Sequence, residues 1–351
     1  MGGSVSVDAT ASLLAEARTN TPLHEVVVAR RGTTRRLWLK LEQYNPTGSI
    51  KYRTAVGLVR ALQAARPLVP DTRVVESTSG NLGVALGRIL ARFECRLTVV
   101  VDPKVSATMR EAIELEGGRV VLVDDRDEFG GYLLSRLAVV HRMCRADHDL
   151  RWTDQYGNRA NPDIHRHSIA VELIRQTAAR VDAVLVAVST GGTLVGISEA
   201  LRAAVPGVQV HAVDVRGSLV TSERGAPHLL TGIGATRRSS FLRPGHVDTV
   251  LRVSDVEAFA FCRMLAADTG LKVGGSSGAV LSAYTSALSS GTERFACPVA
   301  VMPDGGAAYR DTVYDDAWLA AHGVLHAVGD IVLAARRDGV SFRLGRQLDG
   351  P

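Results

Sequence analysis

The chain has 351 residues, which is more than one small core needs and enough for two lobes of ordinary domain size. Hydrophobic residues make up 46% of the chain and charged residues 22%, a balance typical of globular proteins, and no apolar run is long enough to span a bilayer. The formal net charge is +5, but the basic residues are spread out and no DNA-binding motif occurs, so we expect neither a nucleic-acid nor a membrane partner.

The N-terminus lacks a basic start followed by an apolar stretch, so we expect no signal peptide and a cytoplasmic protein. The four cysteines are scattered and form no C-x-x-C pair, which argues against a zinc site or a disulfide framework. We therefore expect no metal and buried free thiols at Cys95, Cys144, Cys262 and Cys297.

Short β-rich runs alternate with amphipathic stretches along the chain, and this alternation predicts an α/β fold with parallel sheets. The predicted strands are Leu37–Leu41, Arg73–Val75, Leu97–Val101, Arg119–Val123, Val184–Val188, Val208–Val213 and Val299–Met302. The predicted helices are Asn81–Arg92, Ala107–Glu116, Asn161–Arg175, Thr193–Ala204 and Val256–Ala267. Ligands of such folds bind where strands end and helices begin, and four motifs fall at those joints.

The first motif is NPTGSIKYR at residues 45–53, a turn that leads into a helix expected to begin near Ser49. Lys51 would lie in the first helical turn, where the macrodipole disfavours a cation and makes the amine easier to deprotonate. A neutral amine suits attack on an aldehyde. The chain has only four lysines, which gives each of them weight, although a solvated surface lysine is the alternative.

The second motif is STSGN at residues 77–81, which follows one predicted strand and opens a helix. Its hydroxyl and backbone N–H groups would suit a carboxylate. Ordinary capping of the helix by Ser79 or Asn81 is the alternative.

The third motif is STGGT at residues 189–193, with Gly196 one turn later, between a strand and a helix. Its glycines would let the backbone approach a phosphate at the helix N-terminus. It matches neither the dinucleotide fingerprint nor the P-loop, so it favours one small phosphate.

The fourth motif is GGSSG at residues 274–278, again before a helix. A serine hydroxyl at this place would be able to face a ring nitrogen, and a tight turn with a helix cap is the alternative.

The order and spacing of the four motifs resemble the cysteine synthase family of fold-type II pyridoxal-phosphate enzymes over roughly residues 20–312. Two further segments support the resemblance: DQY at 154–156 with NPDIH at 161–165 and Glu172, and GIGA at 232–235. The resemblance implies pyridoxal 5'-phosphate as the cofactor and a homodimer. It also implies two lobes, each with a mainly parallel sheet flanked by helices.

The lobes are expected at 45–158 (a smaller, substrate-binding lobe) and at 1–44 plus 159–325 (a larger, cofactor-binding lobe). The tail, 326–351, has no readable role, although it contains a β-like run at Asp330–Ala335.

The resemblance also implies site residues. Lys51 would hold the cofactor as a Schiff base and carry the Cα proton. Ser276 would face the pyridine nitrogen as a neutral partner, which weakens the electron sink and favours β-elimination to an aminoacrylate. The cofactor would further contact Asn81 through its 3'-oxygen and Ser189, Thr190, Gly191, Gly192 and Thr193 through its phosphate. The substrate carboxylate would be held by Thr78, Ser79, Gly80 and Gln155, with Tyr156 beside them.

Departures from the family pattern affect the second substrate. The usual K-D-R is Lys51-Tyr52-Arg53 here, the M-S-x-E-R-R loop is only echoed around Thr108, and the late S-G-E-R-Y is replaced by DGGAAYR at 304–310. The segments around Tyr52, Thr108 and Arg237 would therefore belong to the acceptor half of the site.

The motifs DQY, VSTGG and GIGATRR resemble the branch that makes 2,3-diaminopropionate precursors for siderophores or antibiotics. That branch joins O-phospho-L-serine to L-glutamate, giving N-(2-amino-2-carboxyethyl)-L-glutamate. Arg237 and Arg238 are candidates for binding the oxyanions, with surface arginines as the alternative. A cysteine synthase that uses sulfide and a catalytically idle, cofactor-binding partner protein are the competing functions.

Overall fold

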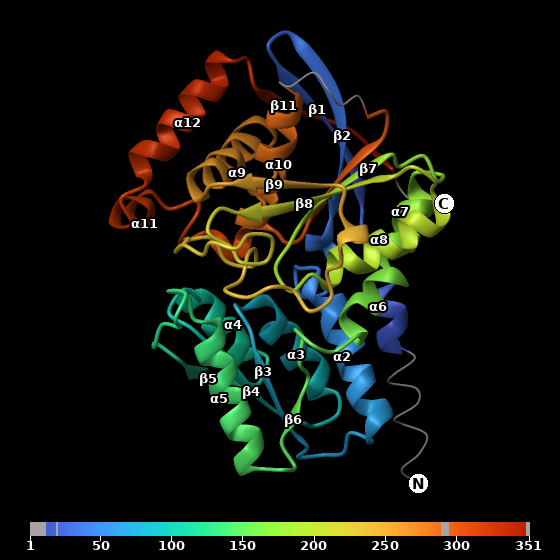
Figure 1. The fold of residues 1–351 in the computed structure, drawn as a ribbon, viewed down its shortest axis with the longest axis vertical. Coiled ribbons are helices and arrows are strands. Elements are labelled where there is room, and N and C mark those ends of the chain that lie inside the picture. Colours follow the sequence, from blue (N-terminus) through green and yellow to red (C-terminus); the bar gives the residue numbers. More distant parts are fainter. Residues whose placement is uncertain (1–11, 19, 289–294, 349–351) are drawn as a thin grey trace.

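The computed structural model describes residues 12–18, 20–288 and 295–348. Two sheets, one of four strands and one of seven, lie one above the other along the long axis of the molecule (Figure 1). The described helices include none that is both long and apolar enough to cross a membrane.

The smaller sheet is entirely parallel, in the order β5-β4-β3-β6. Alternate residues of its strands face opposite ways. Val74 and Val99 pack in the core that includes α2 and α3, whereas Val75 and Val100 pack with Val140 of α5. The elements of this lobe are α2 (Lys51–Ala65), β3 (Arg73–Ser77), α3 (Asn81–Ala91), β4 (Arg96–Val101), α4 (Ala107–Leu115), β5 (Gly118–Leu122), α5 (Leu133–Ala146) and β6 (Arg151–Trp152).

The larger sheet has the order β11-β1-β2-β10-β7-β8-β9 and is mixed. Strands β2 to β9 in this order are parallel, while β1 and β11 add an antiparallel edge that the predicted mainly parallel sheet did not specify. Its strands are β1 (Leu23–Arg30), β2 (Thr33–Leu41), β7 (Ala183–Ala187), β8 (Gln209–Val215), β9 (Thr249–Val253), β10 (Pro298–Met302) and β11 (Ser341–Leu348).

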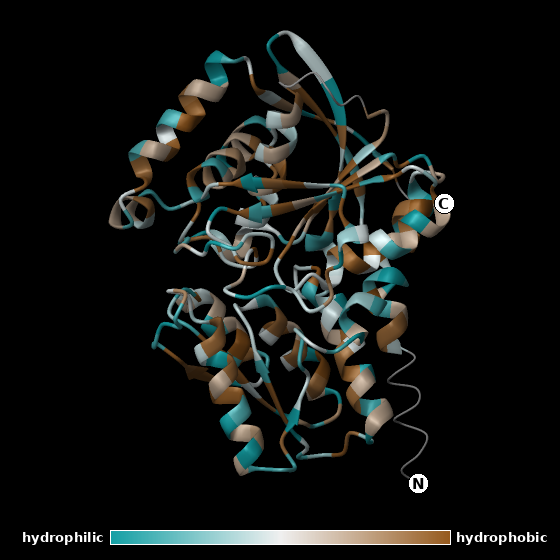
Figure 2. Ribbon diagram, in the orientation of Figure 1, coloured by the Kyte–Doolittle hydropathy of each residue, from teal (hydrophilic) through white to brown (hydrophobic). Residues whose placement is uncertain are grey.

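Helices cover both faces of the larger sheet, and brown apolar segments face inward between the layers (Figure 2). On β10, Val299 and Val301 pack with α7 and α8, whereas Ala300 and Met302 pack with α9 and α10. The remaining helices are α6 (Ala160–Arg166), α7 (Ile169–Gln176), α8 (Gly192–Ala204), α9 (Asp255–Thr269), α10 (Gly275–Ala287), α11 (Asp316–Ala321) and α12 (Leu325–Arg337).

All seven predicted strands are strands, and four of the five predicted helices are single helices. The predicted helix Asn161–Arg175 is instead two helices, α6 and α7, because the chain turns at His167 and Ser168. The β-like run Asp330–Ala335 is wrong as a strand, since it lies inside α12. The cysteines are free, as expected, but only Cys262 is fully buried and the other three are partly exposed.

Candidate active site

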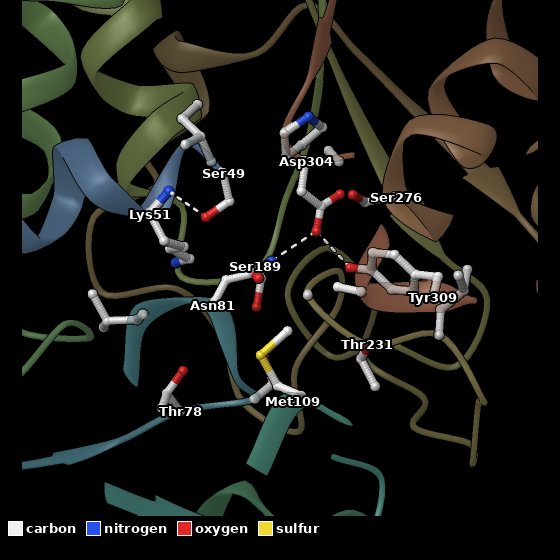
Figure 3. A pocket seen from close by; sticks show the side chains of 18 of the residues that line it. Ser49, Lys51, Thr78, Asn81, Met109, Ser189, Thr231, Ser276, Asp304 and Tyr309 are labelled. Atoms are coloured by element: carbon white, nitrogen blue, oxygen red, sulfur yellow. Dashed lines mark hydrogen bonds between the residues drawn. The ribbon is translucent and has the colours of Figure 1, made fainter. Parts of the chain in front are cut away.

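A cavity opens between the two sheets, where the carboxyl ends of strands lead into helices (Figure 3). We call it the central cavity. Its lining residues fall within the segments 49–51, 78–82, 104–109, 186–194, 229–232 and 301–318, together with Phe259 and Ser276. Both lobes therefore contribute to it.

Lys51 is the first residue of α2 and reaches the central cavity. The preceding turn is fixed by Gly48, which has φ 72°, and by the N–H of Ile50, which donates to Pro303 O at 2.7 Å. The Nζ of Lys51 donates to Gln155 Oε1 at 3.2 Å. Burial lowers the pKa of Lys51 to about 8, against a smaller opposing effect of the Glu76 carboxylate. Its amine is therefore partly neutral near physiological pH.

Charged side chains are buried beneath the start of α2. The Arg53 guanidinium donates to Glu42 at 2.7 Å and to Glu172 at 2.6 Å, and Lys40 Nζ lies 2.6 Å from Glu172. Despite desolvation, the neighbouring Arg53 and Lys40 hold the pKa of Glu42 down at about 2. The sequence pattern marked Arg53 and Glu172 only as family positions, and the structure adds that they anchor the helix that carries Lys51.

The glycine-rich turn at residues 189–193 leads from β7 into α8 and lines one end of the central cavity. Gly191 has φ 90°, a conformation that favours glycine, and a Cβ on Gly192 would overlap the side chain of Asn161. The backbone N–H groups at the start of α8 form the kind of site that binds phosphate. His165 Nε2 lies 3.3 Å from Thr193 Oγ1, and burial lowers the pKa of His165 to about 3, so its ring is neutral.

The turn at residues 77–81 lines the opposite side of the central cavity with Thr78, Ser79 and Asn81. Gly80 has φ 132°, and Met109 packs where its Cβ would be. Gln155, which follows β6 in the same lobe, closes this turn, because its Nε2 donates to Ser77 O at 2.6 Å. The result is a set of hydroxyl and N–H donors at the start of α3 that suits a carboxylate.

Asp304 is a buried carboxylate in the central cavity that the sequence pattern did not single out as a site residue. Its Oδ2 accepts a hydrogen bond from Asn81 Nδ2 at 2.7 Å and one from the Tyr309 hydroxyl at 2.5 Å (Figure 3). Burial raises the pKa of Asp304 to about 6. Ser276, in the first turn of α10, lines the same cavity.

A second cavity, here called the side cavity, adjoins the central one and shares Ser79, Lys104 and Ser189 with it. Arg136 of α5 lines the side cavity and is 5% exposed. Its Nε lies 3.2 Å from Asp102 Oδ2, while neither Nε nor Nη1 has a hydrogen-bond partner among the described residues. A buried guanidinium whose Nε and Nη1 make no hydrogen bond has donors available for an anion. Arg136 was not among the predicted site residues, because an arginine on a helix of an arginine-rich chain gives no signal by itself.

The predicted residues separate into groups in the structure. Tyr156 lines the side cavity, and the Arg237 guanidinium lies 5.9 Å from the centroid of its ring. Arg238 lies outside both cavities, is exposed and pairs with Glu223 at 3.0 Å. The structure brings together Lys51, Thr78, Ser79, Asn81, Ser189, Thr190, Gly191, Thr193 and Ser276 in the lining of the central cavity.

Two of the departures from the family pattern do not lie in the cavities. Tyr52 is fully buried and its hydroxyl donates to Glu16. Thr108 Oγ1 donates to Asp311 Oδ2 at 3.0 Å, a contact between the lobes. The side chains of Tyr52 and Thr108 thus line neither cavity, whereas Ser106 and Met109, next to Thr108 in sequence, line the central one. That these segments belong to the acceptor half stays a prediction.

The central cavity fits an aldehyde cofactor with one phosphate. It combines a lysine of lowered pKa, a turn at the N-terminus of α8 with no room for a side chain at Gly192, and a buried serine in the first turn of α10. These features agree with the requirements of pyridoxal 5'-phosphate.

Comparison with known proteins also indicates a pyridoxal-phosphate-dependent enzyme. A family model described as "Pyridoxal-phosphate dependent enzyme" matches residues 14–296. Two curated relatives, from Ralstonia nicotianae and Cupriavidus metallidurans, are named N-(2-amino-2-carboxyethyl)-L-glutamate synthase. Each is 37% identical, over 90% and 89% of this chain and 93% and 92% of the relatives, respectively.

Solved structures with the same fold include an O-ureido-L-serine synthase, with a TM-score of 0.75 and 28% identity over 88% of this chain and 98% of that one. A hydrogen sulfide-producing enzyme from Fusobacterium nucleatum has a TM-score of 0.78 and 26% identity, over 87% of this chain and 91% of that one.

Proposed function

The chain belongs to the pyridoxal-phosphate-dependent enzyme family, and from this premise we propose that it joins O-phospho-L-serine to L-glutamate. The products would be N-(2-amino-2-carboxyethyl)-L-glutamate and inorganic phosphate. The observation that carries the choice of donor is the buried Arg136 guanidinium in the side cavity, next to the residues that would hold the serine.

We assign the cofactor to the central cavity. Lys51 would bind its aldehyde carbon, and the turn from Ser189 to Thr193 would bind its phosphate, supported by the closeness of Gly192 to Asn161. Asn81 would face its 3'-oxygen and Ser276 its ring nitrogen. When bound, the cofactor supplies the electron sink that allows a leaving group to depart from the serine β-carbon.

The donor carboxylate would bind the turn formed by Thr78, Ser79 and Gly80, closed by Gln155, where helix N–H groups and hydroxyls meet. The phosphate of the donor would then point toward Arg136, with Tyr156 as a neighbouring wall. A guanidinium binds phosphate through two parallel hydrogen bonds, and the low exposure of Arg136 makes those bonds stronger than they would be in water.

Bond changes in the proposed reaction are simple. Lys51 would first be released from the cofactor when the donor's amine takes its place, and its free amine would then take the α-proton. The carbon–oxygen bond at the β-carbon breaks, and phosphate leaves with the bonding electrons. The α-amine of glutamate bonds to the β-carbon, loses one proton to solvent, and Lys51 returns the α-proton. A lysine with a pKa of about 8 is suited to accept and to donate that proton.

Arg237 and Arg238 would act on the substrates from outside the central and side cavities. Arg237, beside Tyr156, is proposed at the rim of the side cavity. Arg238 is exposed and paired with Glu223, so its proposed contribution is limited to the attraction of anions from solution.

We further propose that the enzyme is a cytoplasmic homodimer, an assembly that the family resemblance suggests, and that it serves a siderophore or antibiotic pathway. Light scattering on the purified protein tests the assembly, and a mass near that of one chain would contradict it.

The test of the proposed function measures the release of phosphate from the donor and the transfer to the acceptor separately. Holoenzyme is incubated with O-phospho-L-serine and then with L-glutamate or sulfide, while phosphate release and the product mass are measured. We expect phosphate release and the glutamate adduct. A product formed with sulfide but not with glutamate would identify a cysteine synthase. The absence of both phosphate release and a change in the absorbance spectrum would identify an idle cofactor-binding protein.

Arg136 provides the sharper variant. In Arg136→Met we expect the KM for O-phospho-L-serine to rise about 10- to 100-fold, because a charge-assisted hydrogen bond is lost, while O-acetyl-L-serine is unaffected. Arg142→Met, on the exposed side of the same helix, is the control. An equal loss with both donors would remove the reason for assigning the phosphate to Arg136.

A further inference from the structure

Lys104 lies in the loop between β4 and α4, at the junction of three cavities. It lines the central cavity, the side cavity and a third one, here called the outer groove, which runs between residues 103–110 and 227–229. Among the residues that the structure describes, no other lines all three. A group at this junction meets any ligand that passes from the outer groove toward Lys51.

The charge of Lys104 is only partly used by the protein. Its Nζ donates one hydrogen bond, to His228 O at 2.6 Å, whereas an ammonium group has three donors. Two carboxylates are near it, but Asp102 Oδ1 accepts from the backbone N–H of residue 104, and Asp255 accepts from the N–H groups of Leu229 and Leu230. Burial lowers the pKa of Lys104, and these two carboxylates oppose the shift. The ammonium thus has donors available for an anion.

The outer groove adds further cations. Arg110 and Arg126 line it, and Arg126 is exposed at its rim. Two carboxylates line it as well: Asp255 accepts from the N–H groups of Leu229 and Leu230, and Asp311 accepts from Thr108 through Oδ2, while its Oδ1 has no hydrogen-bond partner among the described residues. With Lys104, three cations thus face two carboxylates. Such a groove concentrates small anions near its mouth.

The proposed reaction leaves both carboxylates of the acceptor without an assigned partner. The donor would use the turn at residues 78–80 and Arg136, and Arg238 lies outside the central and side cavities. Glutamate brings a second carboxylate that neutral acceptors lack, and burying it unpaired would be costly. Lys104 is a cation that lines the central cavity and also faces the groove from which an acceptor would approach.

We infer that Lys104 binds the side-chain carboxylate of the acceptor amino acid, which enters along the outer groove with its α-amine directed toward the central cavity. This inference rests on the proposed function and deepens it, because it assigns the choice of a dicarboxylate acceptor to one residue. No bond to Lys104 forms or breaks; its ammonium orients the acceptor by hydrogen bonding and charge.

The experiment compares L-glutamate with L-glutamine, whose side chain has no charge, and with sulfide, which has no side chain. Wild type, Lys104→Gln, Lys104→Met and Lys104→Arg are assayed with L-glutamate, L-glutamine and sulfide, and phosphate release from O-phospho-L-serine alone is measured separately. Lys104→Gln keeps a donor for the His228 carbonyl, so it removes the charge without removing that contact. We expect the KM for glutamate to rise about 10- to 100-fold in the Gln and Met variants, with glutamine, sulfide and phosphate release unchanged.

Lys104→Arg keeps the positive charge and should retain most of the preference for glutamate. Lys272→Met is the matched control, since Lys272 is exposed, lies over the Tyr314 ring and lines none of the three cavities. An equal loss with glutamate and glutamine, or a parallel loss of phosphate release, would overturn the inference while the proposed function stands. If wild type transfers only to sulfide, the proposed function fails and the inference fails with it.

Discussion

Burial, more than position along a helix, lowers the pKa of Lys51, the residue proposed to bind the cofactor. The sequence placed it correctly in the first helical turn, and a dipole argument predicted an amine that loses its proton easily. In the structure, desolvation is the leading cause of the lowered pKa, and the carboxylate of Glu76 opposes it. Desolvation depends on packing against residues distant in the sequence, so a linear pattern indicates the direction of such a shift and not its cause.

The pKa of Lys51 predicts how cofactor capture depends on pH. The reactive form is the neutral amine, so the capture rate should rise about tenfold per pH unit below 8 and level off above it. An ordinary lysine, with a pKa of 10.5, would give a rate that still rises at pH 10. Stopped-flow absorbance of apoenzyme mixed with pyridoxal 5'-phosphate measures the rate.

Two results would check the assignment of this rate to Lys51. Borohydride should fix the cofactor to the peptide that contains Lys51, and a label on Lys40, Lys104 or Lys272 would contradict it. Lys40 is also buried, but its ammonium is held by Glu172 at 2.6 Å and is not free to react.

Asp304 is a residue that only the fold brings to the cofactor site. In the sequence it stood in a segment that departs from the family pattern and carried no predicted role. The structure places its carboxylate against Asn81 and Tyr309, 223 and 5 residues away in the chain. The Asn81 amide has a second N–H, so one can orient the side chain toward Asp304 while the other faces the cofactor.

Loss of the Asp304 carboxylate should weaken cofactor binding. We expect Asp304→Ala to raise the dissociation constant of pyridoxal 5'-phosphate about tenfold, because Asn81 and Tyr309 lose a charged hydrogen-bond partner. Tyr309→Phe should cause a smaller rise in the same direction. Fluorescence titration of the apoenzyme gives the constant, and Tyr284→Phe, whose hydroxyl bonds Arg36 O, is the control. Equal affinities for Asp304→Ala and wild type would show that this carboxylate does not position the site.

At the scale of elements, the start of α2 depends on charges buried beneath it. Arg53 has no exposed surface and lies between Glu42 and Glu172, and Lys40 completes the cluster. Charged groups at these positions are costly to bury, and the mutual pairing offsets that cost only while every partner is present. The cluster ties α2 to β2 and α7, and so it fixes the helix end that carries Lys51.

Removing one charge from this cluster should be strongly destabilising. We expect Glu172→Gln to lower the free energy of unfolding by about 3–5 kcal/mol, since the buried Lys40 and Arg53 would then have only the Glu42 carboxylate between them. Asp147→Asn breaks the Arg73 pair at 2.5 Å on the partly exposed surface and should cost about 0–1 kcal/mol. Urea unfolding compares the two, and similar losses would mean that the buried cluster is not essential to the fold.

The predicted strands show how far a short stretch of sequence determines secondary structure. Six of the seven predicted strands were found because each has a short run rich in valine, Leu37–Leu41 was found as an apolar run without β-branched residues, and both faces of the sheets are covered. The run at Asp330–Ala335 has the same composition but lies in α12, where Val328, Ile331, Val332 and Ala335 repeat at helical spacing against the core. A six-residue window is too short to distinguish the two periods.

The whole molecule determines which predicted residues meet. The four motifs converge on the central cavity because each follows a strand or opens a helix at the edge where the lobes face each other. Lys104 and Asp304 join them there, and Arg136 reaches the adjoining side cavity, only through the arrangement of the lobes. No spacing rule identifies such residues. Arg238 illustrates the opposite outcome, since its neighbours in sequence reach the side cavity while its own side chain pairs with Glu223 at the surface.

The C-terminal segment is part of the larger lobe. Strand β11 pairs with β1 at the edge of the seven-stranded sheet, and α12 packs on α9. Phe342 of β11 is 3% exposed, and its ring lies 6.1 Å from that of Phe261. Asp268 of α9 accepts from the Phe342 N–H at 2.9 Å and pairs with Arg336 at 2.6 Å. These contacts cover one face of α9, which also packs on α10, the helix whose first turn contains Ser276.

Truncating Phe342 should therefore destabilise the whole larger lobe. Phe342→Ala leaves a cavity against Phe261, and we expect it to lower the free energy of unfolding by about 3–5 kcal/mol. Leu333→Ala, on the exposed side of α12, is the control and should change it by less than about 0.5 kcal/mol. Urea unfolding followed by tryptophan fluorescence suits the measurement, because Trp318 packs against the same core. If Phe342→Ala unfolds at the same urea concentration as Leu333→Ala, β11 is only an appendage of the sheet, and its pairing with β1 contributes nothing to holding α9 and α10 in place.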